Sequence, residues 1–110
     1  MFYIDKRTNK ITLTRGDSAE IAVSVVDANG EDRGIFADDV LTLTVRQKAS
    51  SPVASITKTA IDGVFVLEPA DTANLPSGTY VYDVELKSFT GKTYTIIPKS
   101  SFALEEDITR

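Results

Sequence analysis

The sequence is dominated by runs in which every second residue is hydrophobic. In TYVYDVELK, the hydrophobic side chains of Tyr80, Tyr82, Val84 and Leu86 alternate with a second, mostly polar set, and VLTLTVRQ (40–47) alternates in the same way. Side chains of a β-strand point alternately to the two faces of its sheet. This period of two therefore predicts strands that bury one face against a core and expose the other.

Similar runs extend along the whole chain and are separated by turn signals. Asn29-Gly30 and Asp62-Gly63 are typical of tight hairpins, and Gly91 lies between two expected strands. Short strands with a turn every 8–12 residues or so favour a β-sandwich. We therefore predict an all-β, immunoglobulin-like antiparallel β-sandwich of about eight or nine strands. Besides the two runs above, strands are expected at 2–4, 10–14, 20–27, 54–59, 63–68, 92–97 and 101–106.

The segment EPADTANLPSG (68–78) interrupts the alternation and predicts a corner between strands. One short helical turn is expected near 70–75, with Asp71 as its N-cap and the downstream proline and glycine ending it. In β-sandwiches such a corner can carry a tyrosine whose hydroxyl bonds nearby backbone. Tyr80 is the first candidate for this role and Tyr82 the second. The predicted structural corner consists of Asp71, Leu75, Pro76, Gly78 and Tyr80.

The domain organisation expected from the sequence is simple. The chain has 110 residues, which fits one domain, and no linker-like stretch divides it. Residues 1–9 are expected to form an N-terminal arm and residues 10–110 a single β-sandwich domain.

Composition leaves few groups for catalysis. The chain contains neither cysteine nor histidine, which excludes thiolate metal ligands, a Ser–His pair and a side chain that ordinarily titrates near neutrality. The acidic clusters Asp38-Asp39 and 105–107 are expected to be solvated, and DANGED (27–32) fits a hairpin turn better than a calcium loop. We predict that the protein is not an enzyme and has no catalytic residue, no cofactor and no metal site.

Charge and hydropathy narrow the range of partners. The net charge is −4 and the isoelectric point about 4.7, which argues against binding to nucleic acid or to anionic lipid. The start, MFYIDKRTNK, lacks the apolar segment of a signal peptide, and no apolar run approaches the roughly 20 residues that span a bilayer. Neither nucleic acid nor membrane is expected as a partner, and synthesis is expected in the cytosol.

A sandwich leaves unpaired edge strands and a few exposed aromatic side chains, where partners can bind. The edges are expected at FYI (2–4) and ASITKTA (54–60), and Phe2, Tyr3 and Ile4 form the candidate interface. Core positions are predicted for Tyr80, Tyr82, Tyr94, Phe65 and Phe102. The aromatic residues predicted to be free are Tyr3, Phe36 and Phe89.

Several motifs are spread over residues 10–110. They are Gly16-Asp17, Asn29-Gly30, Thr44-Val45-Arg46, the LPxGxYxYD run at 75–83, a glycine-turn hairpin and the terminal DITR. Together they resemble the small β-sandwich domains of bacteriophage and prophage virion proteins, in particular the N-terminal domain of the baseplate upper protein of siphophages. Pro98 and the apolar start MFYI depart from this pattern, and Pro98 cannot donate a bond in the last strand.

The resemblance implies a non-enzymatic structural or assembly module of a phage or prophage virion, associated with the tail or baseplate. It implies binding to copies of itself or to other virion proteins, with homo-oligomers expected, in the bacterial host cytoplasm during assembly and then in the virion. The alternative is a ligand-binding sandwich, either carbohydrate-binding or adhesin-like. Such a module would stack sugars on the free rings of Phe36 and Phe89.

Overall fold

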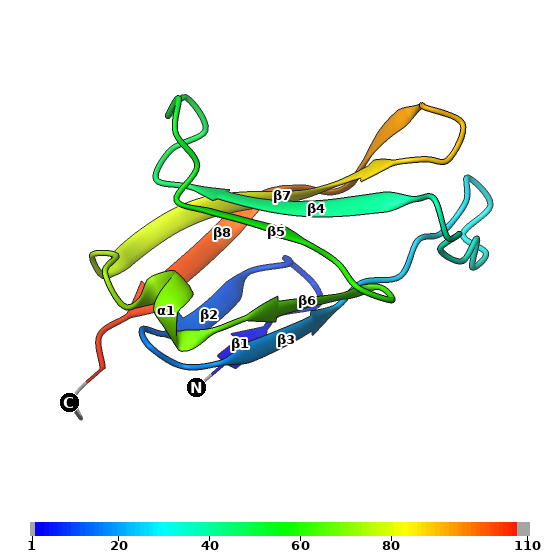
Figure 1. Cartoon of the computed structure of the whole chain (residues 1–110). Helices are drawn as coiled ribbons and strands as arrows, with labels where there is room; N and C mark the ends of the chain where they lie inside the picture. The colour runs from blue at the N-terminus through cyan, green and yellow to red at the C-terminus, as the bar shows by residue number, and fades with distance from the viewer. Residues whose placement is uncertain (1, 108–110) are drawn as a thin grey trace.

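Two stacked β-sheets form the protein in the computed structural model, which describes residues 2–107 (Figure 1). The larger sheet has six strands in the order β1-β2-β8-β7-β4-β5, and the smaller sheet pairs β3 with β6. The predicted all-β, immunoglobulin-like sandwich is confirmed, although β2 and β8 pair in parallel. The elements are β1 (Phe2–Ile4), β2 (Ile11–Thr14), β3 (Ala19–Ala22), β4 (Val40–Arg46), β5 (Ile56–Thr59), β6 (Val64–Leu67), α1 (Pro69–Thr72), β7 (Gly78–Lys87) and β8 (Thr93–Glu105).

The alternating hydrophobic residues fill the space between the sheets. In β4 and β7, the residues predicted on the core face are buried, while their neighbours in sequence are more exposed. Tyr94 is an exception because its side chain is 49% exposed. The prediction of a core position for Tyr94 is wrong because the β7–β8 hairpin extends beyond the short strands of the smaller sheet (Figure 1). The buried aromatic side chains are Phe65, Tyr80, Tyr82 and Phe102.

The two strands expected at 92–97 and 101–106 are one long strand, β8. Its pairing with β7 shifts register between the pairs Tyr82–Ser100 and Val84–Ile97. Pro98 falls within this irregular interval, where an extra residue leaves the regular ladder, so its missing N–H removes no ladder bond there. The prediction of separate strands is therefore wrong, because the shift absorbs the proline.

Both predicted edges are confirmed: β1 and β5 lie at the two ends of the six-stranded sheet. The first residues do not form a separate arm, because β1 pairs with β2 through Ile4 and Ile11. Phe2 and Ile4 pack against the core, whereas Tyr3 is 57% exposed. The expected arm at 1–9 is thus, in its described part, the first hairpin of the sandwich.

The corner before β7 contains the short helix α1. Its N-cap is Glu68, and Asp71 lies at the third helical position, where its carboxylate accepts the Glu68 N–H at 2.7 Å. The prediction of Asp71 as N-cap is wrong because Pro69 occupies the first turn, where a proline is favoured and sets the start of the helix. Asp71 also pairs with Lys58 of β5, Nζ to Oδ2 2.8 Å.

Burial of Asp71 would by itself raise its pKa. The Lys58 ammonium and the Glu68 N–H outweigh this and hold the pKa of the carboxyl below its ordinary value. Lys58 shares a face of β5 with the buried Ile56, so it is an inward-pointing charge on an edge strand. Such charges oppose pairing with another strand.

Two tyrosine hydroxyls bond to backbone from β7. The Tyr80 hydroxyl donates to the Pro76 carbonyl at 2.6 Å, which is the bond of a tyrosine corner. The Tyr82 hydroxyl donates to the carbonyl of Asn9 in the β1–β2 turn. Burial raises the pKa of Tyr80, and that of Tyr82 to about 12. Among the residues described here, no helix is long and apolar enough to cross a membrane.

Tyr80→Phe is expected to lower the free energy of unfolding by about 1 kcal/mol, because the buried end of the side chain loses its hydrogen bond. Urea denaturation measures this change. The matched control is Tyr3→Phe, since Tyr3 is exposed, and we expect its effect to stay within about 0.5 kcal/mol. Equal effects of the two substitutions would show that the corner bond does not contribute to stability.

Candidate functional site

Exposed hydrophobic side chains gather at one end of the molecule. This end is built from the loop between β3 and β4 and from the tip of the β7–β8 hairpin, and α1 lies at the opposite end (Figure 1). Phe36 is 50% and Phe89 57% exposed, as predicted for free aromatic residues. Patches of this kind mark interaction sites. We call this set of side chains the aromatic end: Val26, Ile35, Phe36, Val40, Phe89 and Tyr94.

The carboxylate of Asp39 joins the two segments of the aromatic end. It accepts the Phe36 N–H at 2.8 Å and, from the hairpin tip, the Phe89 N–H at 2.9 Å. Arg33 donates to it from Nη1, also at 2.8 Å. The side chain of Asp39 is completely buried by these partners. We call this arrangement the Asp39 latch.

The latch corrects the prediction for the acidic pair Asp38-Asp39. Asp38 is exposed, as expected, but the buried carboxylate of Asp39 accepts hydrogen bonds from three residues. The hydrogen bond from Arg33 is the largest influence on Asp39 and, with the two backbone N–H groups, outweighs burial and lowers its pKa to about 2. The carboxylate is therefore ionised at every physiological pH.

The two exposed rings lie against each other above the latch. The Phe36 and Phe89 centroids are 5.3 Å apart and the ring planes meet at 79°, an edge-to-face contact. The Arg33 guanidinium carbon lies 4.8 Å from the Phe36 centroid, within cation–π range. Two backbone anchors and two ring contacts thus fix the orientation of these side chains.

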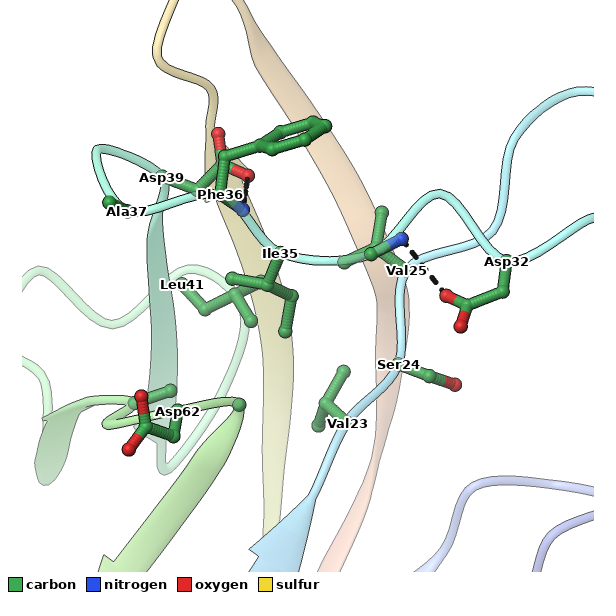
Figure 2. Close-up of a pocket in the computed structure, with 13 residues that line it drawn as sticks. Val23, Ser24, Val25, Asp32, Ile35, Phe36, Ala37, Asp39, Leu41 and Asp62 are labelled. Carbon is green, nitrogen blue, oxygen red and sulfur yellow. Dashed lines mark hydrogen bonds between the residues drawn. The ribbon is translucent and has the colours of Figure 1, made fainter.

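A hollow of about 510 Å³ lies beneath the loop that carries Phe36. Figure 2 shows its apolar part, where Val23, Ile35 and Leu41 approach one another. Two of its carboxylates, Asp32 and Asp62, lie at separate corners (Figure 2), and among the described residues no group of three acidic side chains could hold a metal ion. The hollow therefore brings together no set of groups suited to acid–base or metal chemistry.

The turn at Gly63 lines one side of this hollow, and a substitution there probes how tightly the hollow is packed. Gly63 has a φ of +78°, and a Cβ there would lie 2.9 Å from Ile35 Cδ1 and 3.3 Å from the Val23 carbonyl oxygen. Gly30 has a φ of +79° with open space around it. Both substitutions to alanine place a side chain in the left-handed region, but only Gly63→Ala also crowds its neighbours.

We expect Gly30→Ala to lower the free energy of unfolding by about 1–2 kcal/mol from backbone strain. Gly63→Ala should cost about 1 kcal/mol more, because the end of Ile35 has to move. Chemical denaturation of both variants measures the difference. Equal losses would mean that the Ile35 side chain moves aside freely.

A second hollow, of about 710 Å³, lies between the loop and the inner face of the β7–β8 hairpin. Val26, Phe89 and Tyr94 supply much of its apolar surface. Asp27 lines it from the loop and Lys92 from the hairpin. Arg33 also lines it from the loop, where it pairs with Asp39. The remaining charges of this apolar hollow are Asp27 on the loop side and Lys92 on the hairpin side.

Sequence reasoning found the exposed aromatic rings but not their connection. Asp39 and Phe89 are 50 residues apart, so no local pattern relates them. Arg33 and Asp39 are only six residues apart, and this short separation of opposite charges was the one sequence signal that could have indicated their ion pair. The candidate interface at Phe2, Tyr3 and Ile4 lies on the outer edge of β1.

Comparison with protein-family models gives no match, and no curated protein matches the sequence. Among solved structures, the crystal structure of CopC from Methylosinus trichosporium OB3b is similar over 69% of this chain and 76% of that chain, at 14% sequence identity and a TM-score of 0.41.

Proposed function

We propose that this protein is a non-enzymatic assembly module that acts through protein–protein contacts at its aromatic end, as a tail- or baseplate-associated subunit of a phage or prophage virion. The observation that carries the contact is the Asp39 latch, which ties together the backbone at Phe36 and Phe89, whose exposed rings meet edge to face. Aromatic anchors dominate the energy of protein interfaces, and fixing them in advance lowers the entropic cost of binding. The virion context rests on the resemblance of residues 10–110.

The perturbed titratable groups of the described chain are engaged in structural bonds, which supports a non-enzymatic function. Asp39 is bound by Arg33, and Asp71 by Lys58. The hydroxyls of Tyr80 and Tyr82 both donate to backbone carbonyls. Perturbed pKa values point to catalysis when the group faces a cleft and is free to react. In this protein, each of these groups with a shifted pKa is bound to a partner that stabilises the fold.

The alternative, a carbohydrate-binding module, is favoured by the exposure of Phe36 and Phe89. A sugar stacks on an open ring face. Arg33 already lies over one face of Phe36, and the two rings meet edge to face rather than forming a flat platform. This geometry fits a protein contact better. Glycan binding that is lost in both Phe36→Ala and Phe89→Ala would establish the alternative instead.

The outer edge of β1 is a second place where a protein partner can add. It is the unpaired edge of the large sheet at Phe2, Tyr3 and Ile4, and these three residues carry no charge. The other edge, β5, has the inward-pointing Lys58. Edge pairing with another chain is therefore more favourable at β1 than at β5.

The virion role is tested in particles purified from the source strain. Quantitative mass spectrometry should find the wild-type chain and a Val53→Ala control, whose substituted side chain is 74% exposed in the β4–β5 loop. Incorporation of the Phe36→Ala/Phe89→Ala variant should fall at least about tenfold, because two aromatic anchors are lost. Unfolding midpoints of the purified variants confirm that they fold. Particles without the wild-type chain would contradict the virion role.

A further inference from the structure

Charged side chains of opposite sign flank the aromatic end on its two sides. Residues 27–39 of the loop contain five acidic residues and one basic residue, and the basic one, Arg33, is already paired with Asp39. The hairpin tip between Leu86 and Thr95 contains two charged residues, Lys87 and Lys92, and both are exposed. We call these the acidic rim and the basic rim: Asp27, Glu31, Asp32 and Asp38, and Lys87 and Lys92.

We propose that the aromatic end binds a second copy of this chain in a two-fold symmetric contact, with the acidic rim of each copy against the basic rim of the other. The inference rests on the proposed function, because it names the partner in the same protein–protein contact. In a two-fold contact, the same surface on both subunits meets itself after a rotation. A surface with one sign of charge on each side of an apolar centre is complementary to itself under that rotation.

The charge of the whole molecule makes this arrangement informative. Two copies with a net charge of −4 each repel one another in most orientations. When the acidic rim of one copy faces the basic rim of the other, the local interaction at both ends of the contact becomes attractive. Opposite rims therefore select one relative orientation of the two copies.

The apolar centre provides the burial that the contact needs. Phe36 of the acidic loop and Phe89 of the basic hairpin tip contact each other, so their rings lie where the two charged segments meet. Val26 and Tyr94 add exposed apolar surface beside them. A specific contact buries about 800 Å² on each partner, which is about a ninth of the 7048 Å² surface of this molecule. The Asp39 latch keeps both rings ordered before binding, so little side-chain freedom is lost in the contact.

The test exchanges charges on exposed rim residues whose side chains form no hydrogen bond or ion pair among the described residues. One variant, Lys87→Glu/Lys92→Glu, makes both rims acidic, and the other, Glu31→Lys/Asp38→Lys, removes the net charge of the four-residue acidic rim. Asp27 and Asp32 are left unchanged because their carboxylates accept backbone N–H groups in the loop. A matched control for the first variant, Lys48→Glu/Lys99→Glu, makes the same change in net charge as Lys87→Glu/Lys92→Glu at exposed positions outside the two rims.

Sedimentation equilibrium at low salt should show a dimer of the wild type that weakens as salt is added. The dissociation constant should rise at least about tenfold for each rim variant alone, and by much less for the control, which adds only the general repulsion of the extra charge. An equimolar mixture of the two rim variants should associate more tightly than either variant by itself, because the fully acidic variant again meets an intact basic rim. This recovery shows that the acidic rim of one copy meets the basic rim of the other, and an association that stops at the dimer distinguishes a two-fold contact from a head-to-tail one.

Three results would overturn the proposal. The first is a wild type that stays monomeric to about 1 mM, a concentration at which even a weak specific contact forms. The second is a dimer that the rim variants and Phe36→Ala/Phe89→Ala leave intact. The third is a mixture of the two rim variants that associates no better than either variant alone. A monomer whose incorporation into particles still requires Phe36 and Phe89 would leave the proposed function standing with a different partner. The two proposals therefore fail separately.

Discussion

Replacing Phe102 by alanine is expected to lower the free energy of unfolding by about 3–5 kcal/mol. Phe102 is 1% exposed and lies in β8, between β2 and β7 in the large sheet. Its ring meets that of Tyr82 edge to face, with centroids 6.2 Å apart. The strands on both sides of β8 are held by their own ladders, so the sheets cannot close around the missing ring and a cavity remains.

The loss is a large share of the 5–15 kcal/mol or so that stabilises an ordinary domain. Equilibrium denaturation measures it, and the matched control is Phe89→Ala, which deletes the same ring from an exposed position. We expect the control to lose about 1 kcal/mol or less. Comparable losses from both substitutions would contradict the placement of Phe102 in the core.

The parts of the fold that the sequence predicts are those governed by local alternation. The buried faces of β4 and β7 follow directly from every-other-residue hydrophobicity, because the two faces of a strand are fixed by its own geometry. The edges at 2–4 and 54–60 were also predictable, since one run is short and the other is rich in polar residues. Each of these features depends on a few consecutive residues.

The features that sequence reasoning missed depend on what lies opposite a residue in space. Tyr94 has the alternation of a core residue, but no strand of the smaller sheet covers that part of the hairpin. Asp71 has the chemistry of an N-cap, but Pro69 sets the start of the helix one turn earlier. Asp39 looks like a solvated acid in sequence and becomes buried because Arg33, the Phe36 backbone and the hairpin tip enclose it.

Opening the Asp39 latch is expected to release the aromatic end without unfolding the sandwich. In Asp39→Ala, the N–H groups of Phe36 and Phe89 lose their acceptor, and Arg33 loses its partner. Hydrogen exchange of these two amides should accelerate on the order of 100-fold. In the wild type, each amide exchanges only after its strong, charge-assisted hydrogen bond to Asp39 breaks, and the variant has no such bond to break. Amides in the centre of β4 and β7 should keep their protection.

Acid should open the same latch in the wild type. The pKa of Asp39 is lowered from an ordinary value of 3.8 to about 2 in the folded protein. A carboxylate with a depressed folded pKa stabilises the fold fully above its unfolded pKa and loses that contribution as the pH falls. The stabilisation from Asp39 should therefore be complete above about pH 5 and disappear between about pH 4 and pH 2.

The amide resonances of Phe36 and Phe89 report this titration directly, because both N–H groups donate to the titrating carboxylate. They should shift together with a midpoint near pH 2, and the shift should vanish in Asp39→Asn, which carries no titrating proton at that position. Asp38→Asn removes the adjacent, exposed carboxylate and should leave the midpoint unchanged. A midpoint near 3.8 for both amides, or an unaltered titration in Asp39→Asn, would show that Asp39 does not hold the loop and hairpin together. The two rings would then meet a partner as mobile side chains, and the argument for a preorganised contact surface would lose its physical basis.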